Sequence, residues 1–185
     1  MASINHSEKH TWYRSIDRYL LVVLLVFPAQ IFAQHNVPPT EEFAVTGAVK
    51  KEIKYTISDL SKFKSESLGD IVAGNKPGEP KKIAKNASGI LLKTILDSVG
   101  IVVNNHKEHN EIVIVLTATD GYINVYSWNE LFNSEAGNHV YLITEMDGES
   151  INKMQDRILV LSLSDNFLGG RHMKGLAKIE VERIK

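Results

Sequence analysis

The sequence predicts an α+β domain in which mixed sheets carry a few short helices. Its centre is a strand–turn–strand–helix unit. The strand Ile112–Leu116 is a continuous apolar, β-branched run, which indicates burial on both faces. Asp120 and Gly121 follow as a turn-forming pair. Ser127 and Glu130 have the spacing of a capping box, in which each side chain satisfies a backbone N–H at the start of a helix.

Apolar runs of strand length recur on both sides of this unit. The segment 53–57 alternates apolar and polar residues, as half-buried strands do, and the C-terminal segment 176–184 alternates in the same way. Ser58 offers a cap for a short helix. We therefore expect further strands at residues 43–49, 53–57, 68–73, 140–144, 157–163 and 176–184.

The clearest predicted helix is Ser88–Gly100. Its apolar residues fall on one helical stripe, and Gly100 suits the left-handed position past a helix end. The preceding segment, Gly74–Ala87, contains two prolines and four lysines, which predicts an exposed loop or hairpin tip. Asn104–Glu111 is expected to be a polar connection into the central strand.

Composition excludes several classes of function. The chain has 185 residues, 43% of them hydrophobic, and a formal net charge of −1, which is typical of an ordinary globular protein. No acidic or basic excess favours a nucleic-acid partner. The sequence contains no cysteine, so disulfides, cysteine-ligated metals and cysteine nucleophiles are excluded.

Residues 1–33 are predicted to be a secretory signal peptide. Arg14 and Arg18 precede the apolar run Tyr19–Ala33, which ends in small residues. The run is shorter than the roughly 20 apolar residues of a spanning helix, and Pro28 interrupts it. Cleavage would follow Ala33, and an uncleaved signal anchor is the alternative.

Cleavage would leave a flexible lead-in at residues 34–42 and one domain at residues 43–185. The chain would then be exported to the periplasm or secreted, with no stable membrane span. The short signal favours a bacterial exporter. The two arginines are not adjacent, so the general route for unfolded chains is expected rather than the twin-arginine route for folded ones.

A glycine-hinged basic loop is the best candidate site in the sequence. Gly170 and the glycine before it let backbone N–H groups approach a ligand closely. Arg171, His172 and Lys174 supply donors for a phosphate or carboxylate. We expect an anionic small molecule here, with a solvated strand-entry loop as the alternative.

Two other groups of residues have competing interpretations. Asp120 is either a functional carboxylate at a strand end or the first residue of a turn, and Tyr122 either lines a cleft or packs in the core. His106 and His109 are spaced so that one helical turn would let them share a metal. The segment is polar, so a connection is favoured and no metal site is predicted.

Several short motifs occur in an order that resembles the molybdopterin-binding domain of the sulfite-oxidase family. They include V-T-G-A-V near the start, T-D-G-Y after the central strand, R-I-L-V near the end, and G-R-H-M-K before a closing I-E-V. The similarity extends over about residues 43–184. The motifs lie at residues 45–49, 57–60, 89–100, 119–122, 147–150, 157–160 and 170–181.

The resemblance implies a sulfite-oxidase-type fold and a molybdopterin cofactor. It makes Gly170, Arg171, His172 and Lys174 candidates for holding a pterin phosphate. Asp120 and Tyr122 match the family's strand-end motif. Oxidases of the family ligate molybdenum through a cysteine, and this chain has none.

We therefore expect an exported binding protein for an anionic small ligand, without redox catalysis. One alternative is a molybdopterin-dependent oxidoreductase with a non-cysteine metal ligand. Another is an interaction module that binds a protein partner and no small ligand.

Overall fold

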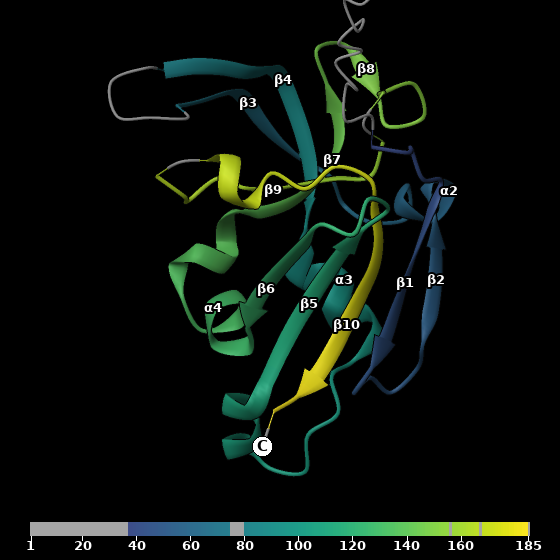
Figure 1. Ribbon diagram of the computed structural model, residues 1–185, viewed down its shortest axis with the longest axis vertical. Helices are drawn as coiled ribbons and strands as arrows, with labels where there is room; N and C mark the ends of the chain where they lie inside the picture. The colour runs from purple at the N-terminus through teal and green to yellow at the C-terminus, as the bar shows by residue number, and fades with distance from the viewer. Residues whose placement is uncertain (1–36, 75–79, 156, 167, 185) are drawn as a thin grey trace, which may run out of the picture. The chain divides into compact units, whose positions relative to one another are not determined.

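A computed structural model describes residues 37–74, 80–155, 157–166 and 168–184. Val37–Lys185 forms one compact unit, built from two sheets with short helices at their ends (Figure 1). This mixed content is compatible with the α+β class predicted from the sequence. The predicted signal peptide lies outside the described residues. Within those residues, no helix is both long and apolar enough to cross a membrane.

The first sheet contains the predicted central strand. β1 pairs in parallel with β10, and every other neighbouring pair is antiparallel. The N- and C-terminal strands of the unit therefore lie side by side, with the central β5–β6 hairpin next to them (Figure 1). In spatial order the strands are β2 (Ile53–Thr56), β1 (Glu42–Gly47), β10 (Leu176–Arg183), β5 (Ile112–Ala118) and β6 (Ile123–Ser127).

The second sheet is antiparallel throughout. Its centre is β7, which pairs with β4, β8 and β9. All four residues of β9 are buried, including the polar Ser162, so the strand is buried as the sequence predicted. The strands are β3 (Glu66–Gly74), β4 (Pro80–Leu91), β7 (Val140–Met146), β8 (Glu149–Ser150) and β9 (Leu159–Ser162).

Short helices connect the strands. α3 packs against β4 and β7 through a buried apolar stripe, and it ends at Gly100, whose φ of +68° confirms the predicted left-handed cap. The α-helices in the described residues are α2 (Ile57–Leu60), α3 (Leu92–Val99) and α4 (Trp128–Phe132), and the 3₁₀ segments are η1 (His106–Glu111), η2 (Glu135–His139) and η3 (Leu168–Arg171).

Two predicted elements differ from the structure in their type or their starting residue. The Gly74–Ala87 segment was expected to be a loop, but Pro80–Leu91 is a strand because it forms a long ladder with β3; residues 75–79 lie outside the described part. The helix expected from Ser88 starts only at Leu92, because Gly89 and its neighbours pair with β7. The ladder therefore overrides the apolar stripe that suggested helix.

The two remaining differences are local. β5 is not buried on both faces: Ile112, Ile114 and Leu116 are buried, while Val113 and Val115 on the opposite face are half-exposed. Successive side chains of a strand point to opposite faces of its sheet, so one face of β5 is buried and the other is half-exposed.

The cap of α2 is Thr56 rather than Ser58. The Thr56 side chain accepts from the Asp59 backbone N–H, and the Asp59 carboxylate accepts from the Thr56 N–H at 3.0 Å. The three-residue spacing of a capping box therefore selects the last residue of β2.

Candidate functional site

The predicted basic loop is fixed against the central hairpin and β9. Met173 exchanges two backbone hydrogen bonds with Val160, at 2.8 and 3.0 Å. The Tyr122 hydroxyl donates to the Gly170 carbonyl at 2.7 Å. In the orientation that satisfies its amide, Asn124 donates to the same carbonyl at 3.3 Å. The structure therefore brings Tyr122 and Gly170 together, as two of the six predicted site residues.

Asp120 stabilises its own turn. Its carboxylate accepts a hydrogen bond from the Tyr122 backbone N–H at 2.9 Å, and Gly121 has a φ of +84°. This is the geometry of a side chain that folds back over two residues, which is the turn interpretation of the sequence. Tyr122 is 42% exposed, so it lies at the surface rather than in the core.

Arg171 is engaged by two carboxylates. Its Nε and Nη2 donate to the two oxygens of Asp165, each at 2.8 Å, and its Nη1 donates to Glu130. Its guanidinium carbon lies 4.9 Å from the centre of the Tyr126 ring. We call Tyr126, Glu130, Asp165 and Arg171 the Arg171 cluster. Charge-assisted, bidentate hydrogen bonds of this kind are strong and directional.

The electrostatics of the Arg171 cluster are those of a satisfied cation. All three charged side chains are mostly buried, with 29%, 29% and 13% exposure for Arg171, Glu130 and Asp165. The hydrogen bonds to Glu130 and Asp165 hold the pKa of Arg171 above its usual value, although burial opposes this. Two carboxylates against one guanidinium leave a local excess of negative charge.

Tyr126 completes the buried side of the cluster. It is fully buried, and its hydroxyl has no hydrogen-bond partner among the described residues. Burial raises the pKa of Tyr126 to about 12, and the positive charge of Arg171 opposes that rise. The tyrosine therefore stays protonated across the physiological range.

The sequence did not single out the residues that complete the cluster. Glu130 was expected to cap the N-terminus of α4, but only Ser127 does so, accepting from the Glu130 backbone N–H at 3.0 Å. The Glu130 carboxylate turns to Arg171 instead, because a charged partner is stronger than a backbone N–H. Asp165 is held in place by Ser162, whose hydroxyl donates to it at 2.9 Å.

His172 and Lys174 flank the buried Met173 on the same loop, and both are half-buried. The cluster of Gly170, Arg171, His172 and Lys174 as an anion site stays a prediction. Its donor set does not fit a pterin phosphate held by Arg171, because Glu130 and Asp165 already occupy the guanidinium. A molybdenum thiolate ligand is also missing from this cysteine-free sequence.

The histidines considered as metal ligands have local structural partners. His109 stacks on Trp128 with ring centres 4.0 Å apart. Glu108 pairs with Arg183 at 2.6 Å and accepts from the Asn104 backbone N–H at 2.8 Å. In the described part of the chain, no group of three or more metal-ligating side chains is close enough to hold an ion.

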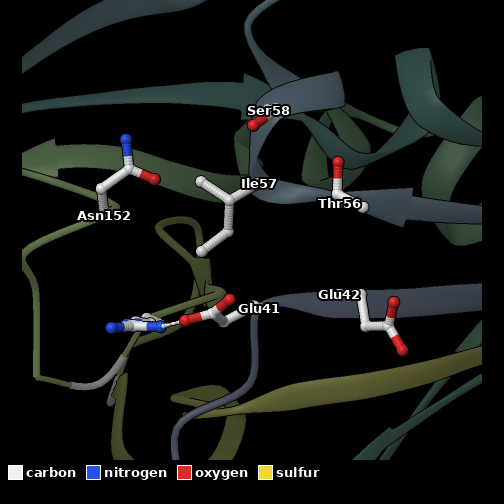
Figure 2. A pocket seen from close by; sticks show the side chains of 7 residues that line it. Glu41, Glu42, Thr56, Ile57, Ser58 and Asn152 are labelled. Carbon is white, nitrogen blue, oxygen red and sulfur yellow. Dashed lines mark hydrogen bonds and ion pairs between the residues drawn. The ribbon is translucent and has the colours of Figure 1, made fainter.

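A second candidate region is an open hollow that sequence reasoning missed. It has a volume of about 690 Å³ and lies between the start of β1, the start of α2 and the turn after β8. Figure 2 shows the Ile57 side chain between Asn152 and Glu41. Glu41 is ion-paired with Arg157 across 116 positions of sequence. The lining residues are Glu41, Glu42, Thr56, Ile57, Ser58, Asn152 and Arg157.

Comparison with known proteins supports the fold and not an activity. No protein-family model matches the chain. No curated protein matches it either. A solved structure that it resembles is the sulfane dehydrogenase SoxCD from Paracoccus pantotrophus, with a TM-score of 0.54 and 11% sequence identity. The match covers 79% of this chain and 40% of that chain, so the present chain spans less than half of the dehydrogenase chain. At this identity the likeness is one of fold.

Proposed function

We propose that this chain is an exported binding protein that has the molybdopterin-binding fold of the sulfite-oxidase family and does not carry out molybdenum redox chemistry. The ordered sequence motifs and the fold shared with a sulfane dehydrogenase support the family assignment. The observation that carries the functional part is the arrangement of Arg171 between Glu130 and Asp165. Arg171, which the sequence suggested as a cofactor-binding residue, bonds instead to two carboxylates of its own chain.

The predicted anionic ligand would then be recognised by the remainder of the loop. Lys174 and His172 flank the anchored Met173, and the backbone at Gly170 lies beside Tyr122. A lysine binds an anion as a point charge and needs no bidentate geometry. Displacing Glu130 or Asp165 from Arg171 would instead cost the hydrogen bonds of a mostly buried pair.

The first experiment measures molybdenum and pterin in protein recovered from its own export compartment. We expect to find neither molybdenum nor pterin, and we expect the N-terminus to be Gln34. One molybdenum and one pterin per chain would overturn the proposal in favour of a molybdopterin-dependent oxidoreductase with a non-cysteine ligand.

The anion site has its own test, a titration with inorganic pyrophosphate followed by NMR shifts. Lys174→Gln is expected to weaken the apparent affinity at least fivefold. Lys153→Gln, which removes an exposed lysine from another turn, is the matched control. Equal affinities for the wild type and both variants would mean that the loop does not recognise anions, and would favour the interaction-module alternative.

A further inference from the structure

A groove near the β2 edge of the first sheet, which is the edge opposite β6, has the features of a separate ligand site. The hollow of about 690 Å³ shares Ile57, Ser58 and Asn152 with a second hollow of about 420 Å³. Both volumes fall in the range of small-molecule pockets. The second hollow adds Leu60, Ser61, Phe63, Ser65, Thr144 and Ile151 to the lining. We call these two adjoining hollows the polar groove.

Backbone hydrogen bonds hold both walls of the polar groove in place. The Ile57 N–H donates to the Glu41 carbonyl at 2.9 Å, which ties the start of α2 to the start of β1. On the other wall, Met154 and Lys153 both donate to the Ser150 carbonyl, and Ile151 donates to Thr144 at 2.8 Å. A pre-formed site loses less conformational entropy when a ligand binds.

The charges at the groove are paired with one another. Glu41 is bonded to Arg157, and Glu42 lies 2.8 Å from Lys54, whose side chain is just outside the lining. The Asp59 carboxyl beside the groove has a pKa well below its usual value, mainly because Lys62 and the Thr56 N–H bond to it. With its charges balanced, the groove has no net preference for an anion or a cation.

The uncharged lining groups can both donate and accept hydrogen bonds. No hydrogen bond joins the side chain of Ser58 or Asn152 to another described residue. Both residues line both hollows, so they lie where the two meet. Ser65 and Thr144 share one hydrogen bond of 2.7 Å, so each hydroxyl keeps acceptor capacity. Anions only accept and ammonium groups only donate, whereas a hydroxyl does both.

The floor of the groove is apolar. Ile57, Leu60 and Ile151 are almost fully buried beneath it, and the half-exposed Phe63 ring forms part of the wall. A saccharide has the matching surface, because its rings present C–H faces and its rims present hydroxyls. We infer that the polar groove binds a neutral saccharide longer than one ring, with Ser58 and Asn152 as its central hydrogen-bonding residues.

A peptide fits the groove less well. Extended peptides are usually held by main-chain hydrogen bonds to a free strand edge. β2 is an edge strand, but only its last residue, Thr56, lines the groove. The rest of the lining comes from the start of β1, from α2 and the segment 61–65 after it, from the turn after β8, and from Thr144 and Arg157. The peptide is therefore an outcome to be tested and not the proposal.

The test is an NMR titration of the full exported protein with four neutral tetrasaccharides: cellotetraose, maltotetraose, xylotetraose and chitotetraose. Tetra-alanine and pyrophosphate are titrated in parallel. We expect at least one tetrasaccharide to shift the backbone signals of Ser58 and Asn152, and pyrophosphate to leave those signals unchanged. The inference does not depend on the anion site, because the two probes report on different residues.

Two variants locate the site. Asn152→Ala is expected to weaken saccharide affinity at least fivefold, and Ser58→Tyr, which fills the junction of the two hollows from an exposed helix position, is expected to abolish it. Asn166→Ala, at an exposed asparagine on another loop, is the matched control and should leave the affinity unchanged. Melting curves confirm that each variant folds.

Three results would overturn the inference. The first is that none of the four tetrasaccharides shifts groove signals at about 10 mM, a concentration that would reveal even the weak binding given by a few hydrogen bonds. The second is that tetra-alanine shifts these signals and the saccharides do not. The third is that a saccharide binds equally well to the wild type, Asn152→Ala and Ser58→Tyr.

Discussion

The Arg171 cluster and the polar groove are both polar, but they use their polar groups in opposite ways. In the cluster, the guanidinium of Arg171 bonds to two carboxylates, with both Asp165 contacts at 2.8 Å, and its carbon lies 4.9 Å from the centre of the buried Tyr126 ring. In the groove, the ion pair stands at the rim, and the central hydroxyl and amide bond to no other described side chain. The comparison shows that charge alone does not mark a ligand site. Unspent hydrogen-bonding capacity in a pre-formed hollow is the better guide.

Removing the central cation of the cluster is the most direct test of this contrast between cluster and groove. Arg171→Met leaves Glu130 and Asp165 facing each other with no positive charge between them. We expect a loss of about 3 kcal/mol in unfolding free energy, the lower end of the range for a buried pair that loses one partner, because these groups are partly exposed. Urea unfolding followed by circular dichroism measures the change.

Arg157→Met is the matched control at the groove. Its partner Glu41 is 77% exposed, so water can replace the lost contact, and we expect a change below about 1 kcal/mol. Adding Glu130→Gln and Asp165→Asn to Arg171→Met should recover much of the loss, because no like charges then remain. Equal losses for the two arginine variants would mean that the cluster is no more structural than the groove rim.

Alkaline pH sharpens the comparison through Tyr126, which belongs to the cluster and has no counterpart in the groove. Its pKa of about 12 in the folded state exceeds the ordinary value of 10. Between these values the unfolded chain releases its proton while the folded chain retains it. The unfolded state then binds fewer protons, so stability falls as pH rises.

The expected size of this effect is about 1 kcal/mol at pH 11 and about 2 kcal/mol at pH 12. Below pH 9 the contribution is absent, because both states are protonated. The measurement compares the wild type with Tyr126→Phe by urea unfolding at pH 9 and pH 11, so that effects of other groups cancel. A difference between the two proteins that does not change with pH would contradict the buried, protonated tyrosine.

Much of the fold could be predicted from local patterns. The β5–β6 hairpin, its Asp120 turn and the cap at Ser127 depend on residues close in sequence, and the structure confirms them. The long β3–β4 ladder was missed because its lysines and prolines look like a loop. Pairing with β3 and with the distant β7 makes Pro80–Leu91 a strand, and sequence periodicity does not record either pairing.

The candidate site was less predictable for the same reason. Arg171 could be recognised as a cation on a glycine-hinged loop, but its partner Glu130 is 41 positions away. The polar groove combines residues 41, 58 and 157 with the turn at residue 152, and none of these forms a motif with its neighbours. The signal that could have found part of it was the Thr56–Asp59 spacing, which is that of a capping box.

The smallest expected effect lies on the groove wall, at Thr56. Its side chain accepts from the Asp59 N–H and donates to the Asp59 carboxylate at 2.7 Å, so Thr56→Ala removes the N-cap of α2. We expect a loss of about 1 kcal/mol, the typical value for an N-cap. Thr56→Ser keeps the hydroxyl and is expected to stay within a few tenths of a kcal/mol of the wild type. Thermal and urea unfolding of both variants measures the difference. The exposed Thr56 supplies one cap among several hydrogen bonds that hold this wall. A loss as large as that of Arg171→Met would therefore show that the groove is as tightly interlocked as the cluster and would remove the contrast between them.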